Sequence, residues 1–408
     1  MSVPDQDQEP RAKEDQQAAA HTTGGAPRLG ELFLSFLRLG SVSFGGPAMV
    51  AYIKRLAVVR RTWLKEQEFQ DGVALCQAVP GATAMQCAAY VGLRARGLGG
   101  AVAAYVGFGL PAFFLMLGLS VAYQHALQLH AVTSMLAGLR AIVVALIANS
   151  AWTFARSSVK GVRRGMFSAV TAILFLLGGS PFLIVIGAGL AGTLWLRGPS
   201  QALAPASVPR VSGWSTLRSA ALVAAFGIVL LVALFLVDRR LLTLGLVMMK
   251  VDLFAFGGGF ASVPLMYQAV VGSRQWMPAS VFMDGIALGQ ITPGPIVITA
   301  TFVGHQVAGV VGAAVGTVCI FLPSLLMVVL VEPWFSRFRS STRFRGASQA
   351  LVLSFVGLLV SVTIHFAWLT PWNVRSAILA GLALLALLRK VDVVWVVLGG
   401  AAVSAVVL

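Results

Sequence analysis

Charged residues are scarce in this sequence, and their scarcity excludes a soluble globular protein. Of 408 residues, 11% are Asp, Glu, Lys or Arg and 58% are hydrophobic, whereas a soluble domain carries about 25% charged residues. Several apolar stretches, among them 98–123, 131–153 and 217–237, approach the roughly 20 residues that a helix needs to cross a bilayer core. The composition therefore predicts an all-α protein that passes through the lipid bilayer several times.

Cysteines are also few, and motifs for cofactor chemistry are missing. Cys76, Cys87 and Cys319 lie in apolar segments without metal-ligand spacing, which indicates packing residues. The sequence has no Walker-type phosphate loop, no H-E-x-x-H motif and no Cys/His cluster, so we expect no cofactor, no metal site and no enzymatic activity. The net charge of +16 arises from short Lys/Arg clusters between apolar spans. That pattern is typical of cytoplasmic loops and does not indicate nucleic-acid binding.

The sequence contains an internal repeat. Three motifs of the first half return in the same order, 212 or 213 residues later: Phe44-Gly45-Gly46 as Phe256-Gly257-Gly258, Pro80-Gly81 as Pro293-Gly294, and Leu110-Pro111 as Leu322-Pro323. We therefore expect a disordered cytoplasmic tail, a first repeat, a linker with a connecting helix, and a second repeat. Their predicted bounds are 1–28, 29–198, 199–240 and 241–408.

Charge indicates that the two repeats are inverted relative to each other. Each half holds about six apolar segments, and a connecting helix brings the total to about 13. The loops 54–65 and 156–164 are rich in Lys and Arg while their second-half counterparts are not, and the reverse holds for 337–345. Under the positive-inside rule, equivalent loops then face opposite sides of the membrane. Arg239 and Arg240 fit poorly, because they fall on the side that this arrangement makes external.

The Gly-Gly and Pro-Gly motifs interrupt membrane segments at matched positions. Proline removes a backbone donor and glycine adds backbone freedom, so we predict broken or re-entrant helices. The freed N–H groups and positive helix ends suit an anion. The alternative is an ordinary proline kink that packs neighbouring helices. The predicted binding residues are the breaks and the basic and polar side chains near them: Arg38, Gly45, Gly46, Gln77, Pro80, Gly81, Gln86, Lys250, Gly257, Gly258, Gln290, Thr292, Pro293, Gly294 and Thr299.

One cation lies at the same point of each repeat. Arg38 and Lys250 each stand six residues before the phenylalanine of their Phe-Gly-Gly motif, in apolar stretches where ionisable groups are costly. A divalent oxyanion would offset both charges; alternatively, each cation snorkels to an interface. Asp252 lies two residues after Lys250 and either neutralises it or takes part in coupling transport to another ion.

Three further ionisable residues are candidates for coupling. Asp71 and Asp284 match across the repeats at the starts of the Pro-Gly segments, where they cap a helix N-terminus or carry a coupling proton. His305 either packs between helices or titrates during transport. The sequence leaves both pairs of alternatives open.

These residues resemble those of the CHR (chromate ion transporter) family in its long two-domain form. The segments that carry the resemblance are SFGGPAM, RRTWLKEQEFQDGVALCQAVPG, FAFGGGFASVPLM, QWMPASVFMDGIALGQITPGPIVITATFVG and FLPSLLM. The first half departs from the pattern at Ala82, where a proline often follows Pro-Gly, and around Met49-Val50, where a histidine is often found. These departures bear on chromate selectivity more than on the fold.

The resemblance implies a secondary transporter of the bacterial inner membrane. Such a protein exports chromate by alternating access at a site between the repeats, uses a proton or a counter-anion, and confers chromate resistance. A transporter of sulfate or another oxyanion and an anion channel are the alternatives, and whether two copies form a homodimer is left open. Residue chemistry alone leads to an anion; chromate comes from the resemblance.

Overall fold

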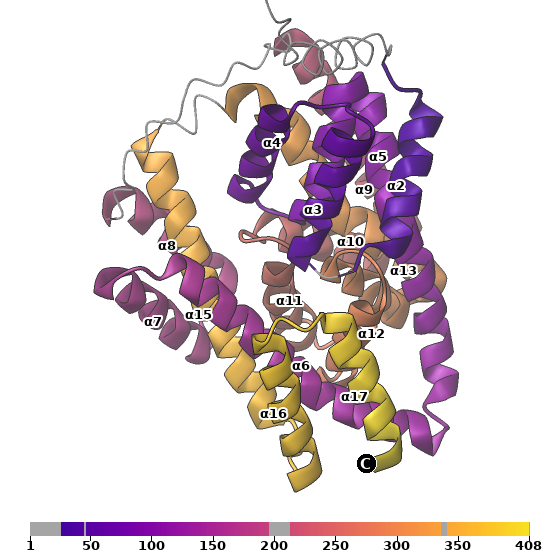
Figure 1. Ribbon diagram of the computed structural model, residues 1–408, viewed down its shortest axis with the longest axis vertical. Helices are drawn as coiled ribbons and strands as arrows, with labels where there is room; N and C mark the ends of the chain where they lie inside the picture. Colours follow the sequence, from indigo (N-terminus) through magenta and orange to yellow (C-terminus); the bar gives the residue numbers. More distant parts are fainter. Residues whose placement is uncertain (1–25, 45, 196–212, 336–340, 408) are drawn as a thin grey trace, which may run out of the picture.

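The computed structural model describes residues 26–44, 46–195, 213–335 and 341–407. Within these ranges every regular element is a helix (Figure 1), which confirms the all-α prediction. Residues 1–25 of the predicted tail, 199–212 of the predicted linker, and Gly45 lie outside the described residues.

The two repeats contain the same order of α- and π-helices, and the second half has two short 3-10 helices, η4 and η5, in addition. The first-half elements are α2 (Leu29–Val42), α3 (Gly46–Lys54), the π-helix η2 (Arg55–Arg60), α4 (Glu66–Ala78), α5 (Thr83–Ala126), α6 (His130–Ser158), α7 (Val162–Leu176) and α8 (Pro181–Trp195). The second-half elements are α10 (Arg239–Leu253), α11 (Gly259–Tyr267), the π-helix η3 (Gln268–Ser273), α12 (Ala279–Ile291), η4 (Ile296–Ile298), α13 (Thr299–Val331), η5 (Glu332–Trp334), α15 (Thr342–Leu369), α16 (Val374–Leu388) and α17 (Val393–Val407). The predicted connecting helix is α9 (Gly213–Val237).

The helices beside the first-half breaks are too short to cross a bilayer. α2 has 14 residues and α4 has 13, so each is about 20 Å long, against a hydrocarbon core of about 30 Å. The chain turns back at each break, and salt bridges join the outer ends of each hairpin. Arg61 Nη1 lies 3.0 Å from Glu31 Oε1, and Arg94 Nη2 lies 3.1 Å from Glu68 Oε1. Both hairpins therefore enter and leave at one end of the molecule, as predicted for re-entrant segments.

α5 and α13 are each interrupted a second time, at equivalent positions. Gly97 in α5 has φ +61° and Gly309 in α13 has φ +59°, each after a residue with φ near −150° (Arg96 −153°, Ala308 −149°). The first leg of each helix completes a hairpin, and the longer second leg crosses the molecule.

The far ends of these two helices establish the inversion. The Tyr123 hydroxyl, near the end of α5, donates to Asp284 Oδ2 on α12 at 2.7 Å. Arg94 Nη1, in the first hairpins, donates to Glu332 Oε1 just beyond α13 at 3.1 Å. Because each long helix ends beside the other half's hairpins, the two sets of hairpins enter from opposite ends.

The two halves also exchange their last helices. α7 and α8 pack against α15 of the second half, and α16 and α17 pack against α6 of the first (Figure 1). α5 and α13 pack along each other, and Tyr105 on α5 donates a 2.7 Å hydrogen bond to the carbonyl of Phe321 on α13. The centre of the molecule is therefore a junction of both repeats.

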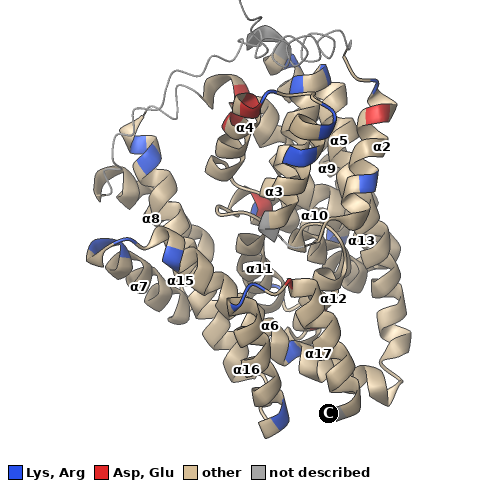
Figure 2. Ribbon diagram, viewed as in Figure 1, with Lys and Arg blue, Asp and Glu red and all other residues tan. Residues whose placement is uncertain are grey.

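The outer surface is that of a multi-pass membrane protein. Within the described ranges, five helices are long and apolar enough to span a bilayer, and several shorter helices are also apolar. Leucine, valine and tryptophan side chains lie exposed on them, such as Leu194 (82%) and Trp368 (75%); a water-soluble surface would not carry such an apolar cover. Figure 2 shows charged residues gathered at the end formed by α3, α4 and α5, with a second group beside α7 and α15.

Candidate functional site

The helix breaks of the two halves are hydrogen-bonded to each other. The Gly81 N–H donates to the Ala255 carbonyl at 3.0 Å, and the Gly294 N–H donates to the Ser43 carbonyl at 2.8 Å. These bonds are equivalent under the repeat, since 255 follows 43 by 212 positions and 294 follows 81 by 213. Each Pro-Gly break therefore lies against the other half's Phe-Gly-Gly break.

Glycine is required at these breaks by backbone conformation. Gly81 and Gly294 have φ values of +117° and +112°, and Gly257 and Gly258 have +102° and +92°, a region that side chains disfavour. A Cβ on Gly81 would also collide with the Ser324 hydroxyl, and one on Gly294 would lie 2.8 Å from Ala112 Cβ. Positions 112 and 324 are themselves equivalent, so the two Pro-Gly turns pack against equivalent residues of the opposite half.

Helices begin immediately after the breaks and point their N-termini at the junction. α3 begins at Gly46, α5 at Thr83, α11 at Gly259, and η4 at Ile296. Three of these starts lie close together: a Cβ on Gly258 would be 3.1 Å from Thr83 Oγ1, and one on Gly259 would be 3.1 Å from Val297 Cγ2. Because the first N–H groups of a helix have no partner within it, this junction concentrates hydrogen-bond donors and partial positive charge.

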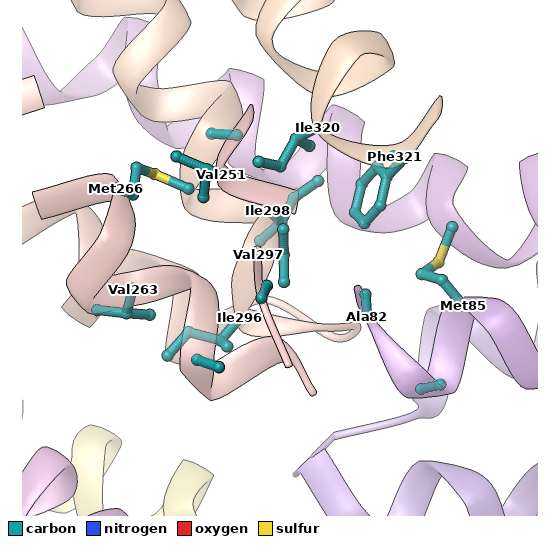
Figure 3. Packing of buried hydrophobic residues seen from close by; sticks show 14 of the residues in the cluster. Ala82, Met85, Val251, Val263, Met266, Ile296, Val297, Ile298, Ile320 and Phe321 are labelled. Carbon is teal, nitrogen blue, oxygen red and sulfur yellow. The ribbon is translucent and has the colours of Figure 1, made fainter. Parts of the chain in front are cut away.

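The junction is surrounded by apolar side chains. Figure 3 shows Ile296, Val297 and Ile298 lying among Val251 and Val263 and beside the α13 residues Ile320 and Phe321. These residues are all buried. An apolar surround lowers the local dielectric and strengthens the field of the helix ends on a bound anion.

The predicted polar ligands differ in whether their side chains have a hydrogen-bond donor free for a bound anion. Gln86 is fully buried and donates to the Pro80 carbonyl at 2.5 Å, and the buried Gln290 Nε2 has no hydrogen-bond partner among the described residues. The Thr292 and Thr299 hydroxyls donate to the carbonyls of Gly289 and Ile296. Gln290 is thus the side chain with a free donor.

Three other predicted ligands are not held inside the junction. Gln77, Arg38 and Lys250 are all exposed. Lys250 Nζ lies 3.7 Å from the centre of the Phe182 ring, a cation–π contact. Lys250 forms no ion pair with Asp252 among the described residues, so the interpretation that Asp252 neutralises it is wrong.

Asp252 instead lies beside the first-half Pro-Gly break. It is 1% exposed, and Ser324 Oγ lies 2.9 and 2.7 Å from its two carboxylate oxygens. The same hydroxyl accepts the Ala82 N–H at 3.2 Å. Sequence reasoning missed Ser324, because nothing in the sequence links it to residues 242 positions away.

The capping interpretation of Asp71 and Asp284 is also wrong. Their helices begin at Glu66 and Ala279, so each aspartate is the sixth residue and lies beyond the capping position. Both are buried. His305 lies on the first leg of α13, half-buried, and its Nδ1 has no hydrogen-bond partner among the described residues.

Asp284 is the centre of a buried cluster that we call the Asp284 clamp. Arg140 on α6 donates to it through Nε (2.7 Å) and Nη2 (2.8 Å), and Tyr123 on α5 donates at 2.7 Å. Arg140 is an ionisable residue inside an apolar stretch, a signal that sequence reasoning overlooked. The cluster ties both first-half helices to the second-half hairpin.

A second cluster, which we call the Arg94 clamp, joins the corresponding elements at the other end of the molecule. Arg94 on α5 bridges Glu68 on α4 and Glu332 after α13, at 3.1 Å each. The arginine side chain is 8% exposed. Each clamp thus joins a hairpin of one half to the far end of the other half's long helix.

The helix starts that converge on the junction have the donors and the partial positive charge that suit an anionic ligand. No group of three His, Cys, Asp or Glu side chains fit to hold a metal ion lies among the described residues. The three cysteines are buried and free. What the junction can do is bind an anion between two structurally matched halves.

Comparison with known proteins places the chain in a protein family. The family described as chromate transporter matches residues 30–193 and 242–405, one match for each repeat. The chain is 42% identical over 371 residues to an uncharacterized transporter of Methanocaldococcus jannaschii, covering 90% of this chain and 91% of that one. It is 32% identical over 396 residues to the chromate transport protein of Cupriavidus metallidurans, covering 93% of both. It is 30% identical over 377 residues to that of Pseudomonas aeruginosa, covering 90% of both. No solved structure shows a significant match.

Proposed function

The chain belongs to the chromate transporter family, and on that premise we propose that it is a secondary active transporter that exports chromate. It would act in the inner membrane of a bacterium and confer chromate resistance. The observation that carries the proposal is the junction of helix N-termini at the four breaks, where Gly81 and Gly294 bond across the two halves. A tetrahedral dianion matches a site whose donors converge from several helix ends.

The proposed ligands follow from this geometry. Backbone N–H groups at the starts of α3, α5, α11 and η4 would hold the oxyanion, with Gln290 and Gln86 beside them. Arg38 and Lys250, one per repeat, would attract the anion from outside the junction. The proposed site comprises Arg38, Gly45, Gly46, Gln77, Pro80, Gly81, Gln86, Lys250, Gly257, Gly258, Gln290, Thr292, Pro293, Gly294 and Thr299.

Alternating access would proceed by releasing one clamp at a time. The Arg94 clamp and the Asp284 clamp lie at opposite ends of the molecule and tie the same kinds of element. Inverted repeats allow one end to open as the other closes, because each half can adopt the other's conformation. A proton or counter-anion gradient would drive the cycle, since the sequence has no nucleotide-binding motif.

Reconstituted flux tests the substrate and the mechanism together. In proteoliposomes, we expect saturable chromate flux that sulfate inhibits and that responds to an imposed pH gradient or a trans anion. The measurement is uptake with competing sulfate, molybdate and phosphate, with and without the gradient. Flux of sulfate but not chromate would reassign the substrate, and an anion conductance indifferent to any second ion would indicate a channel.

Removing either matched cation should weaken transport moderately. Arg38→Ala and Lys250→Ala are each expected to raise the half-saturating chromate concentration about three- to tenfold, or roughly 1 kcal/mol, because each contributes through an exposed charge. Both side chains are exposed, so membrane insertion should be unaffected. The readout is flux in vesicles at matched protein levels, with Arg240→Ala as a basic control on the same helix as Lys250. Wild-type kinetics in both variants would remove the pair from the site.

A further inference from the structure

The carboxylate of Asp252 is buried without a compensating cation. It is 1% exposed, and no Lys, Arg or His nitrogen among the described residues lies within 4.0 Å of it. Two other buried carboxylates, those of Asp284 and Glu332, differ because each pairs with an arginine. An isolated buried carboxylate is costly to keep charged, and it tends to take a proton.

Two helix ends act on this carboxylate in opposite directions. Asp252 is in the last turn of α10, which ends at Leu253, and the partial negative charge there disfavours ionisation. The start of α5 at Thr83 lies just beyond Ala82, whose N–H bonds to Ser324; its partial positive charge favours ionisation. The charge on Asp252 therefore depends on the same helix end that would hold a substrate anion.

The titratable groups on the surrounding elements do not supply another counter-charge. α10 itself carries Arg239, Arg240 and Lys250, and Arg239 and Arg240 lie in its first turn, at the opposite end from Asp252. The elements near α10 include Cys319 on α13, Tyr105 on α5, Tyr267 on α11 and Arg218 on α9. Lys250 contacts Phe182, and Arg218 is exposed. Tyr105 interacts electrostatically with Asp252 while its hydroxyl donates to Phe321.

The repeat contains this arrangement only once. The first-half positions equivalent to Asp252 and Ser324 are Gly40 and Ala112. Gly40 packs its Cα against the Phe108 backbone, where any Cβ would collide. The junction is nearly symmetric between the two halves, but such a carboxylate lies beside it in the second half alone.

We propose that Asp252 takes up one proton when an oxyanion binds at the start of α5, so that anion binding and protonation of this carboxylate are linked. The proton comes from solvent and adds to a carboxylate oxygen. In the empty site, the α5 N-terminus and the Ser324 hydroxyl stabilise the ionised carboxylate. A dianion occupying that helix end removes its favourable field and repels the carboxylate, and protonation relieves both effects. Ser324 connects the two sites, because it contacts the Asp252 oxygens and the Ala82 N–H.

This inference rests on the proposed anion site, and binding measurements separate the two. The purified full chain in nanodiscs is titrated with sulfate, whose charge is constant across the range, and then with chromate. If one proton is taken up per anion, the dissociation constant rises by about tenfold per pH unit once pH exceeds the range in which Asp252 is protonated in the empty protein. Calorimetry in buffers of different ionisation enthalpy counts the proton directly.

Two variants and one control make the assignment specific. Asp252→Asn should flatten the pH dependence and reduce proton uptake to near zero, while binding at high pH stays as tight as wild type at low pH. Ser324→Ala should keep the proton uptake but move the transition to higher pH, because the ionised carboxylate loses its donor. Asp238→Asn should match wild type, since Asp238 caps the opposite end of α10 and Asn caps equally well.

The outcomes are distinguishable. Tight binding with no pH slope in wild type, or an unchanged slope in Asp252→Asn, overturns the proton site and leaves the anion site standing. Absence of binding to both anions at every pH overturns the transporter proposal and this inference with it. If Asp252→Asn does not fold, the shifted transition in Ser324→Ala decides, and an unshifted one counts against the inference.

Discussion

Alanine in place of Gly81 or Gly294 is expected to abolish anion transport. Both glycines have φ above +110°, which costs a residue with a side chain about 1–3 kcal/mol. Their Cβ atoms would press on Ser324 and Ala112 of the opposite half, so the cross-half hydrogen bonds from their N–H groups could not keep their geometry. Because these bonds hold the helix starts together, we expect flux at background and a lower temperature of unfolding.

Two other glycines provide a matched control for this effect. Gly97 and Gly309 also have positive φ, +61° and +59°, but a Cβ at either position would meet nothing within 4 Å. Gly97→Ala and Gly309→Ala should therefore lose about 1 kcal/mol of stability and keep measurable flux. The measurements are sulfate or chromate flux in proteoliposomes and thermal unfolding of each purified variant.

A compensating change tests whether crowding is the cause at one site. In Gly294→Ala the close contact is with Ala112 Cβ, which Ala112→Gly removes. The double variant should recover part of the transport, with the backbone strain still present. If the single variants Gly81→Ala and Gly294→Ala are both fully active, transport does not depend on close packing at the junction.

The breaks could be predicted from the sequence because their cause is local. Gly-Gly and Pro-Gly act on the residues beside them, and the repeat doubles the signal at Pro80 and Pro293. Charge in the loops likewise predicted the inversion, since the positive-inside rule needs only the order of loops along the chain. These features depend on neighbours in sequence, and the structure confirms them.

The contacts that complete the site could not be predicted in the same way. Asp284 looked like a cap because it stands near the start of a segment, while its partner Arg140 is 144 residues away. Asp252 looked like a partner for Lys250 because the two are close in sequence, yet the helix carries the lysine to Phe182. Contacts between the two halves leave no periodic pattern in the sequence. The sequence alone therefore assigns these residues to partners close to them in the chain.

Removing Arg140 is expected to cause the largest loss of stability of the substitutions considered. Asp284 is fully buried and receives two of its three side-chain hydrogen bonds from this guanidinium. Arg140→Ala would leave the carboxylate with Tyr123 alone, and stranding a buried charge costs about 3–5 kcal/mol. We expect the lower part of that range, because the arginine side chain is 26% exposed. Thermal unfolding in detergent and the yield of folded protein are the readouts.

A double-variant cycle separates the ion pair from the packing around it. Arg140→Met with Asp284→Leu removes both charges, so its stability should lie closer to wild type than that of Arg140→Ala. If the clamp also closes this end during transport, the double variant should fold yet lose coupled flux, since an apolar contact cannot be exchanged for water as the end opens. Charge removal at Arg94, in the opposite clamp, should impair flux from the opposite side of the membrane. If the double variant is as unstable as Arg140→Ala, side-chain packing and not the ion pair stabilises this contact. If the double variant transports at the wild-type rate, the Asp284 clamp has no role in the transport cycle.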